Sequence, residues 1–194
     1  MKKIILGAID LSFHKVTAGV FHNVLEYLGY EVETVCKLHE QIFEMQKNGE
    51  IDLLISAWLP GSHAKYLAPY LDEVLLLNAI YEPYCIWGIP DYFAKKGVTS
   101  IADLTRREIT SIMSKKINGI GMGAGISRFS LEIMDDYGLG DIGFEFITNS
   151  PENFNNLVEA QLKARQNFII PLWHPQYLHH MFDIFPLEEP KGLL

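Results

Sequence analysis

Short apolar runs alternate with helical patterns along most of this chain, and this alternation constrains the fold more than any other feature. Strands alternating with helices favour an α/β fold with doubly wound, mostly parallel sheets. The predicted strands are Lys3–Ile9, Tyr30–Cys36, Ile51–Trp58, Glu73–Ile80, Tyr84–Ile89, Ile117–Gly121, Gly143–Ile147, Phe168–Trp173 and Asp183–Leu187. The predicted helices are His14–Leu28, Glu40–Lys47, Pro60–Tyr70, Ile101–Leu104, Ser127–Tyr137 and 151–165.

The length of 194 residues suits one full-sized domain or two small lobes. A boundary near Tyr81–Pro83 divides the chain into a first lobe of residues 1–82 and a second of residues 83–185. We expect the final stretch, 186–194, to return to the first lobe. A cleft between two such lobes is a favoured place for a small-molecule site.

The charge, the cysteines and the spacing of the histidines disfavour several classes of partner and chemistry. A net charge of -8 repels phosphate backbones, so we expect no nucleic-acid binding. Cys36 and Cys85 sit in apolar runs and are predicted to be free thiols. His174, His179 and His180 lack the spacing and the companion ligands of a metal site, and no catalytic motif is present. We therefore expect neither an enzyme nor a cofactor.

The N-terminus resembles the start of a signal peptide but is interpreted as a strand. Met1-Lys2-Lys3 precedes an apolar run that stops at Asp10, with no small-residue cleavage site after it. As written, the chain is predicted to be cytoplasmic.

Two tryptophans occupy matched positions in the two halves. Trp58 ends the strand Ile51–Trp58 and precedes Leu59-Pro60, and Trp173 ends the strand Phe168–Trp173 and precedes His174-Pro175. Ligands in open α/β sheets bind beyond the carboxyl ends of strands, so each half offers one indole ring to a cleft. A quaternary ammonium ion has no N–H to donate, and cation–π contact of roughly 0.5–2 kcal/mol per ring can hold it. Trp87, inside an extended segment, is better explained by packing.

A glycine-rich turn provides the other candidate site. Gly123-Ala124-Gly125 follows a predicted strand, and Ser127 and Arg128 begin the next helix. Helix N-termini bind anions, so the segment is either a carboxylate site or simply a tight turn. His14 and His63, near strand ends, are candidates for hydrogen bonding.

These motifs together resemble the substrate-binding proteins of glycine betaine/choline/proline-betaine ABC transporters. The resemblance rests on segments along nearly the whole chain: 25–32, Trp58-Leu59-Pro60-Gly61-Ser62-His63, Ile89-Pro90-Asp91-Tyr92, Ile101-Ala102-Asp103-Leu104, 119–125 and Trp173-His174-Pro175.

The resemblance implies a two-lobed fold of the type II periplasmic-binding-protein class that closes around its ligand. It implies a receptor for a quaternary ammonium compound, working with an ABC permease and its ATPase on the extracytoplasmic side. The ligand-binding residues expected on this basis are Phe13, His14, Trp58, His63, Tyr84, Trp87, Gly123, Ala124, Gly125, Ser127, Arg128, Trp173 and His174.

Alternatives remain for both the length of the chain and its function. The family continues past Leu187–Lys191, so the chain is a natural short form, a homodimer that completes its fold through a partner, or a degenerate receptor. In function, the rival to a transport receptor is a cytosolic ligand-sensing module on the same fold, and a histidine-based enzyme is a third reading.

Overall fold

The computed structural model describes residues 2–194, which form two compact units. The first unit ends at Glu82, and the second is Pro83–Leu194. Strands are β1 (Lys3–Ile9), β2 (Glu31–Lys37), β3 (Leu53–Leu54), β4 (Tyr84–Pro90), β5 (Lys116–Ile120), β6 (Glu145–Asn149), β7 (Ile170–His174) and β8 (Ile184–Pro186). The α-helices are α1 (Ser12–Tyr27), α2 (His39–Lys47), α3 (Ala64–Leu67), α4 (Asp91–Ala94), α5 (Arg107–Thr110), α6 (Gly125–Asp136), α7 (Pro151–Lys163) and α8 (Leu178–Met181), with 3-10 turns at Ala68–Glu73, Ile101–Thr105 and Gly140–Ile142.

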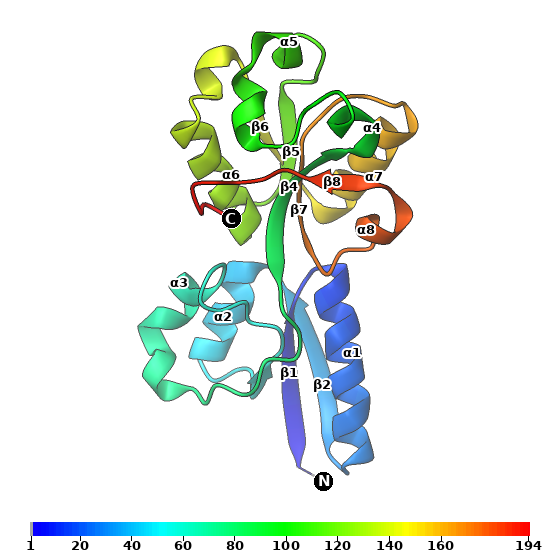
Figure 1. Ribbon diagram of the computed structural model, residues 1–194. Coiled ribbons are helices and arrows are strands. Elements are labelled where there is room, and N and C mark those ends of the chain that lie inside the picture. The colour runs from blue at the N-terminus through cyan, green and yellow to red at the C-terminus, as the bar shows by residue number, and fades with distance from the viewer. Residues whose placement is uncertain (1) are drawn as a thin grey trace. The chain divides into compact units, whose positions relative to one another are not determined.

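The first unit is built on a parallel sheet with strand order β2-β1-β3. Helix α1 lies on one side of this sheet, and α2 and α3 lie on the other (Figure 1). Strand β1 is central and is buried on both faces: Leu6, on one face, is 0% exposed, and Ile9, on the other, is 1% exposed. Between them, Gly7 lets Ile51 approach, since an added Cβ would lie 2.8 Å from the Ile51 Cδ1 atom. The predicted parallel sheet is confirmed in this unit.

Strand β3, at one edge of the same sheet, is shorter than predicted. Of the predicted strand Ile51–Trp58, only Leu53–Leu54 pairs with β1. The predicted strand Glu73–Ile80 is wrong: residues 75–80 carry no strand, and Leu75 and Leu77 are exposed at 84% and 65%. An extended segment becomes a strand only when another strand accepts its hydrogen bonds, and within residues 2–82 none does so here.

Helix α1 confirms the predicted helix, but its regular apolar row faces solvent. Ala18 is fully buried and packs with Leu6 and Ala8, whereas Val16, Val20 and Val24 are 69%, 58% and 48% exposed. The spacing of these valines therefore identifies the helix without identifying the side that meets the sheet.

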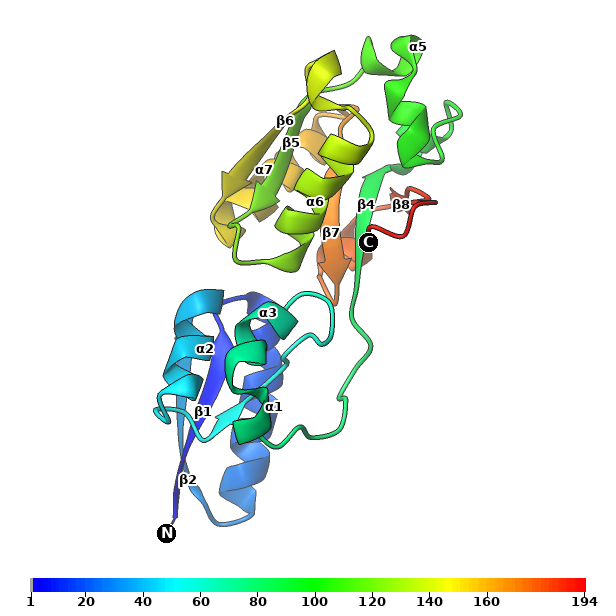
Figure 2. The ribbon, with the colours of Figure 1, turned by 90° about the vertical axis from the view of Figure 1, so that its left-hand side faces the viewer.

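The second unit has a mixed sheet arrangement. Strand β4 pairs antiparallel with both β7 and β8, and β5 pairs parallel with β6. Helices α6 and α7 cover opposite sides of β5 and β6 (Figure 2). The expectation of a mostly parallel sheet is therefore wrong for this unit, because β7 and β8 return along β4 in the opposite direction.

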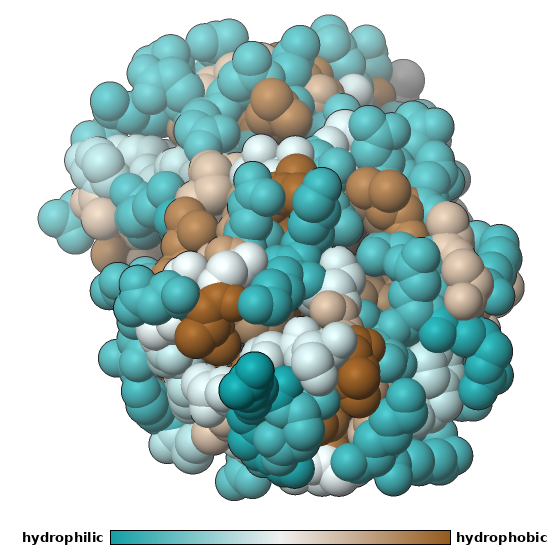
Figure 3. All heavy atoms as spheres, turned by 90° about the horizontal axis from the view of Figure 1, so that it is seen from above, coloured by the Kyte–Doolittle hydropathy of each residue, from teal (hydrophilic) through white to brown (hydrophobic). Residues whose placement is uncertain are grey.

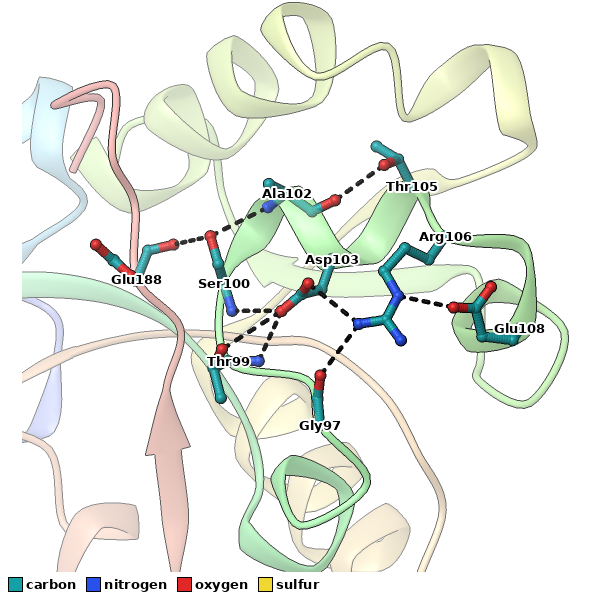
Figure 4. Close-up of polar contacts among 9 residues, drawn as sticks. All are labelled: Gly97, Thr99, Ser100, Ala102, Asp103, Thr105, Arg106, Glu108 and Glu188. Carbon is teal, nitrogen blue, oxygen red and sulfur yellow. Dashed lines mark hydrogen bonds and ion pairs between the residues drawn. The ribbon is translucent and has the colours of Figure 1, made fainter.

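The C-terminal stretch packs on the second unit, which corrects the expected return to the first. Figure 4 shows the Ser100 hydroxyl donating to the Glu188 carbonyl, at 3.1 Å, while the Asp103 carboxylate accepts from the Ser100 amide as in a capping box. The Leu187 amide donates to the Trp87 carbonyl at 2.8 Å. These backbone partners are supplied by the second unit, so the tail remains with it.

Figure 3 shows hydrophilic residues over most of the face in view, with hydrophobic residues interspersed among them. Among residues 2–194, no helix combines the length and the apolar character needed to cross a bilayer.

Candidate functional site

The carboxyl ends of the three parallel strands in the first unit carry its candidate site. Phe13 and His14 begin α1 just after β1, His39 begins α2 just after β2, and Trp58 and His63 follow β3. Because these ends share one edge of the sheet, their rings gather there. Ring centroids are 5.3 Å apart for Phe13 and Trp58, and 5.9 Å apart for His14 and Trp58.

Hydrogen bonds hold Trp58 in a fixed orientation. Its indole N–H donates to the Tyr81 hydroxyl at 2.8 Å, and its backbone N–H donates to the His63 Nδ1 atom at 2.8 Å. The plane of the His63 ring is inclined by 28° to that of the indole, with ring centroids 6.2 Å apart. His63 is buried, whereas Trp58 and Phe13 are half-buried. The rings of Trp58 and Phe13 are therefore the ones in this cluster that keep surface for a ligand.

His14 is buried beside these rings in its neutral form. Its side chain is 1% exposed, and burial lowers its pKa to about 3, with a smaller contribution from the charge of His39. The His14 Nδ1 atom has no hydrogen-bond partner within residues 2–194. The centroids of the His63 and His39 rings lie 5.4 Å apart. His14, His39 and His63 therefore form a cluster beside the rings of Phe13 and Trp58.

The predicted residues of the second unit divide into two groups. Tyr84 and His174 face each other across β4 and β7, with parallel rings 4.9 Å apart. Trp173 is only 4% exposed, and its indole stacks on Phe154 with centroids 5.6 Å apart. Tyr84 is thus accessible for contact, whereas Trp173 presents little surface.

Trp87 serves the core of the second unit. It is fully buried, and its indole N–H donates to the Ser130 hydroxyl at 2.8 Å. A ring with no exposed surface and a satisfied N–H has nothing to offer a ligand, so its inclusion among the ligand-binding residues is corrected to the packing role.

Several polar groups of the glycine turn between β5 and α6 form hydrogen bonds within the turn. The Ser127 hydroxyl is buried and donates to the Ile120 carbonyl at 2.7 Å. The Arg128 guanidinium donates to the Gly123 carbonyl at 2.7 Å. Ala124 is the N-cap of α6 and provides no side-chain cap. Ser127 is therefore corrected from an anion donor to a residue that stabilises the turn. The Ala124 amide also donates within the turn, to the Gly121 carbonyl at 3.1 Å.

Sequence reasoning missed the partners that orient the predicted rings. Tyr81 lies in the segment that ends the first unit, and no local motif distinguishes it. Phe154 lies on α7, which follows β6. His39 was detectable, because it follows a strand end in the same way as His14 does. The two Trp-x-Pro segments also share a backbone feature, since Leu59-Pro60 and His174-Pro175 are both cis.

The polar groups of the described chain do not assemble into a metal-binding set. Within residues 2–194, no cluster of three or more His, Cys, Asp or Glu side chains has a geometry that could hold a metal ion. Cys36 and Cys85 are free and half-buried, and burial raises the pKa of Cys85 to about 12.

The comparisons with known proteins identify the family of this chain. The family model described as the substrate binding domain of ABC-type glycine betaine transport system matches residues 2–194. Lactococcal OpuAC, solved closed with glycine betaine, is similar over 100% of this chain and 73% of that chain, with 25% identity and a TM-score of 0.87. An ABC-transporter choline binding protein solved with choline is similar over 98% of this chain and 66% of that chain, with 18% identity and a TM-score of 0.83.

A curated relative matches a shorter stretch. The glycine betaine/carnitine transport binding protein GbuC of Listeria monocytogenes is 24% identical over 88 residues, which are 45% of this chain and 29% of that protein. The chain thus matches less than a third of that relative's length. The structural matches confirm the predicted type II periplasmic-binding-protein-like fold. Because the family model covers the described chain from end to end, the protein belongs to the family of substrate-binding domains of ABC-type glycine betaine transport systems.

Proposed function

We propose that this protein is the solute receptor of an ABC transporter for a quaternary ammonium compound such as glycine betaine, choline or proline betaine. The observation that carries the proposal is the pair of half-buried rings, Phe13 and Trp58, whose centroids lie 5.3 Å apart at the strand ends of the first unit. Each π face attracts a cation by roughly 0.5–2 kcal/mol.

The groups around the pair suit a cation that cannot donate hydrogen bonds. His14, beside Trp58, is neutral above pH about 3, so it does not repel a positive charge. The Trp58 indole N–H is already bonded to Tyr81, which leaves the ring face as its contact surface. In the second unit, Tyr84, His174 and Trp173 stay predicted ligand contacts, and the backbone of Gly123–Gly125 stays the predicted contact of an anionic group.

Transport is the proposed context. The protein would act on the extracytoplasmic side and deliver its ligand to a permease coupled to an ATPase. The rival function, a ligand-sensing module on the same fold, needs the same ligand but no permease. Co-purification of the protein with a permease in membranes distinguishes the two: recovery with the permease supports transport, and consistent absence supports the sensor.

Titration calorimetry with the three ligands tests the binding proposal. Trp58→Ala should weaken binding about tenfold or more, because it removes a cation–π contact together with the packing around it. Trp58→Phe should bind with intermediate affinity, since it keeps a smaller π face.

The matched control is Trp87→Phe, which alters an indole in the core of the second unit and should leave affinity unchanged. Wild-type protein that binds none of the three ligands contradicts the proposed ligand class. Trp58→Ala that binds as tightly as the wild type contradicts the assigned site.

A further inference from the structure

Tyr81 anchors the stretch of chain that leaves the first unit. Residues 75–83 form neither helix nor strand, and Leu75 and Leu77 are 84% and 65% exposed. Tyr81, in contrast, is half-buried, and its hydroxyl accepts a hydrogen bond from the Trp58 indole N–H at 2.8 Å. A side chain in an irregular segment has a fixed place only where another group holds it, so this bond is what gives Tyr81 its position.

Tyr81 meets Trp58 at the rim of the indole. The N–H bond of an indole lies in the ring plane, so an oxygen that accepts from it lies near that plane and not over a face. The planes of the two rings are inclined by 81°, with centroids 6.4 Å apart, which is an edge arrangement. The hydroxyl therefore occupies the polar edge of Trp58 and does not cover a π face.

The hydrogen bond restricts the indole in a way that apolar contact does not. The rings of Phe13 and Trp58 are tilted by 37° with centroids 5.3 Å apart, and contacts of this kind tolerate rotation of either side chain. A hydrogen bond is directional, so the bond to Tyr81 selects one orientation of the indole. Binding loses less conformational entropy when a ring is already held in the orientation that the ligand needs.

The backbone that leads to Trp58 is also held in an unusual conformation. Ser56 has a φ of 65°, in the left-handed region that favours glycine. Non-glycine residues in that region persist where the surrounding structure over-determines them, and they cluster at active sites and ligand-binding segments. The backbone N–H of Trp58 donates to His63 and its indole N–H donates to Tyr81, each at 2.8 Å. The main chain and the ring of Trp58 are thus fixed by separate partners.

We propose that Tyr81 is a positioning residue of the ligand site, whose hydroxyl holds the Trp58 ring in the orientation that receives a cation. Tyr81 acts through Trp58 and does not itself contact the ligand. This role rests on the proposed function, because that function assigns the cation to the face of Trp58. Burial raises the pKa of Tyr81, so its hydroxyl is uncharged at neutral pH and adds no charge to the site.

A double-mutant cycle followed by titration calorimetry separates positioning from direct contact. The probes are glycine betaine and choline at neutral pH. Tyr81→Phe keeps the ring and removes the hydroxyl, and it should weaken binding about two- to tenfold, as expected for the loss of one hydrogen bond. In the Trp58→Phe background no indole N–H is present, so the same substitution should leave affinity unchanged. Tyr27→Phe, which removes an exposed hydroxyl from the same unit, is the matched control.

Two calorimetric results overturn the role of Tyr81 while the proposed function stands. Equal weakening in both backgrounds shows that the hydroxyl acts by a route other than Trp58. Wild-type protein that binds a probe no more tightly than Tyr81→Phe does shows that the hydroxyl is not needed. A wild type that binds neither probe contradicts the proposed function itself, and the ligand-binding role of Tyr81 with it.

The ligand-free protein provides a second readout that a general loss of stability does not reproduce. The chain has 3 Trp residues, so its nitrogen–proton correlation spectrum contains three indole signals, and the Trp58 signal is the one absent from Trp58→Phe. Tyr81→Phe should shift this signal and speed its hydrogen exchange about two- to tenfold. The signal of Trp87, which donates to Ser130, should stay in place. A Trp58 signal that Tyr81→Phe leaves unchanged overturns the proposal, whether or not a probe binds.

Discussion

Replacement of His14 with asparagine should remove a specific acid sensitivity of the folded protein. In the native state, burial lowers the pKa of His14 to about 3 from an ordinary value of 6.5. The unfolded chain therefore takes up a proton at a higher pH than the folded chain does. The stability that depends on neutral His14 is fully present above about pH 6.5 and is lost as the pH falls from there towards 3.

The size of the effect follows from the two pKa values. Between pH 7 and pH 5, the linkage relation gives a loss of about 2 kcal/mol in the free energy of unfolding from this one group. Because the rings of His39 and His63 lie in the same cluster, the effect of His14 is isolated by comparison with a variant that lacks His14 alone. The informative quantity is consequently the difference between the wild type and the variant.

Urea unfolding at pH 7, 6 and 5, followed by circular dichroism, measures this difference. His14→Asn is expected to be less stable than the wild type at pH 7, because the smaller side chain leaves part of the buried space beside Phe13, Trp58 and His63 unfilled. Its free energy of unfolding should nevertheless fall by about 2 kcal/mol less than that of the wild type between pH 7 and pH 5. His180→Asn, at an exposed histidine, is the control. An unchanged pH dependence in His14→Asn refutes the argument.

Three further substitutions test the packing of the second unit, each by the midpoint of urea unfolding. Gly119→Ala should destabilise it by about 1–3 kcal/mol, because the new Cβ would lie 2.2 Å from the Phe146 ring; wild-type stability would contradict that contact. Ser130→Ala should cost about 1–3 kcal/mol by leaving the buried Trp87 N–H unpaired, and a neutral effect would mean that the indole has another acceptor. Asp103→Ala should cost about 1 kcal/mol through loss of the helix cap, and no change would show that the cap is dispensable.

Much of the fold was predictable because local pattern and burial agree in it. Lys3–Ile9 is apolar after Lys3, and such a run is typical of a central strand in a covered sheet. The predicted strand Glu73–Ile80 failed for the complementary reason: its residues have strand character, but a strand also needs a partner. The orientation of α1 was equally unpredictable, since apolar residues occur on both of its sides and spacing alone does not choose between them.

The candidate site was predictable only in part. The positions of Trp58, His14 and His63 near strand ends predicted that they lie close together, because the carboxyl ends of parallel strands meet at a common edge of the sheet. The same rule could not reveal that the Trp173 ring is buried against Phe154, since that depends on how α7, the preceding helix, packs against β7. Ser127 looked like a free hydroxyl, and only the turn geometry shows its proton committed to Ile120.

The attachment of the C-terminal stretch to the second unit has a practical consequence. Each unit consists of one uninterrupted length of polypeptide, joined to the other between Glu82 and Pro83. The gene could therefore be split at that bond into two reading frames without interrupting any sheet or helix. Such a split would allow each half to be labelled, titrated or exchanged with the corresponding half of a relative.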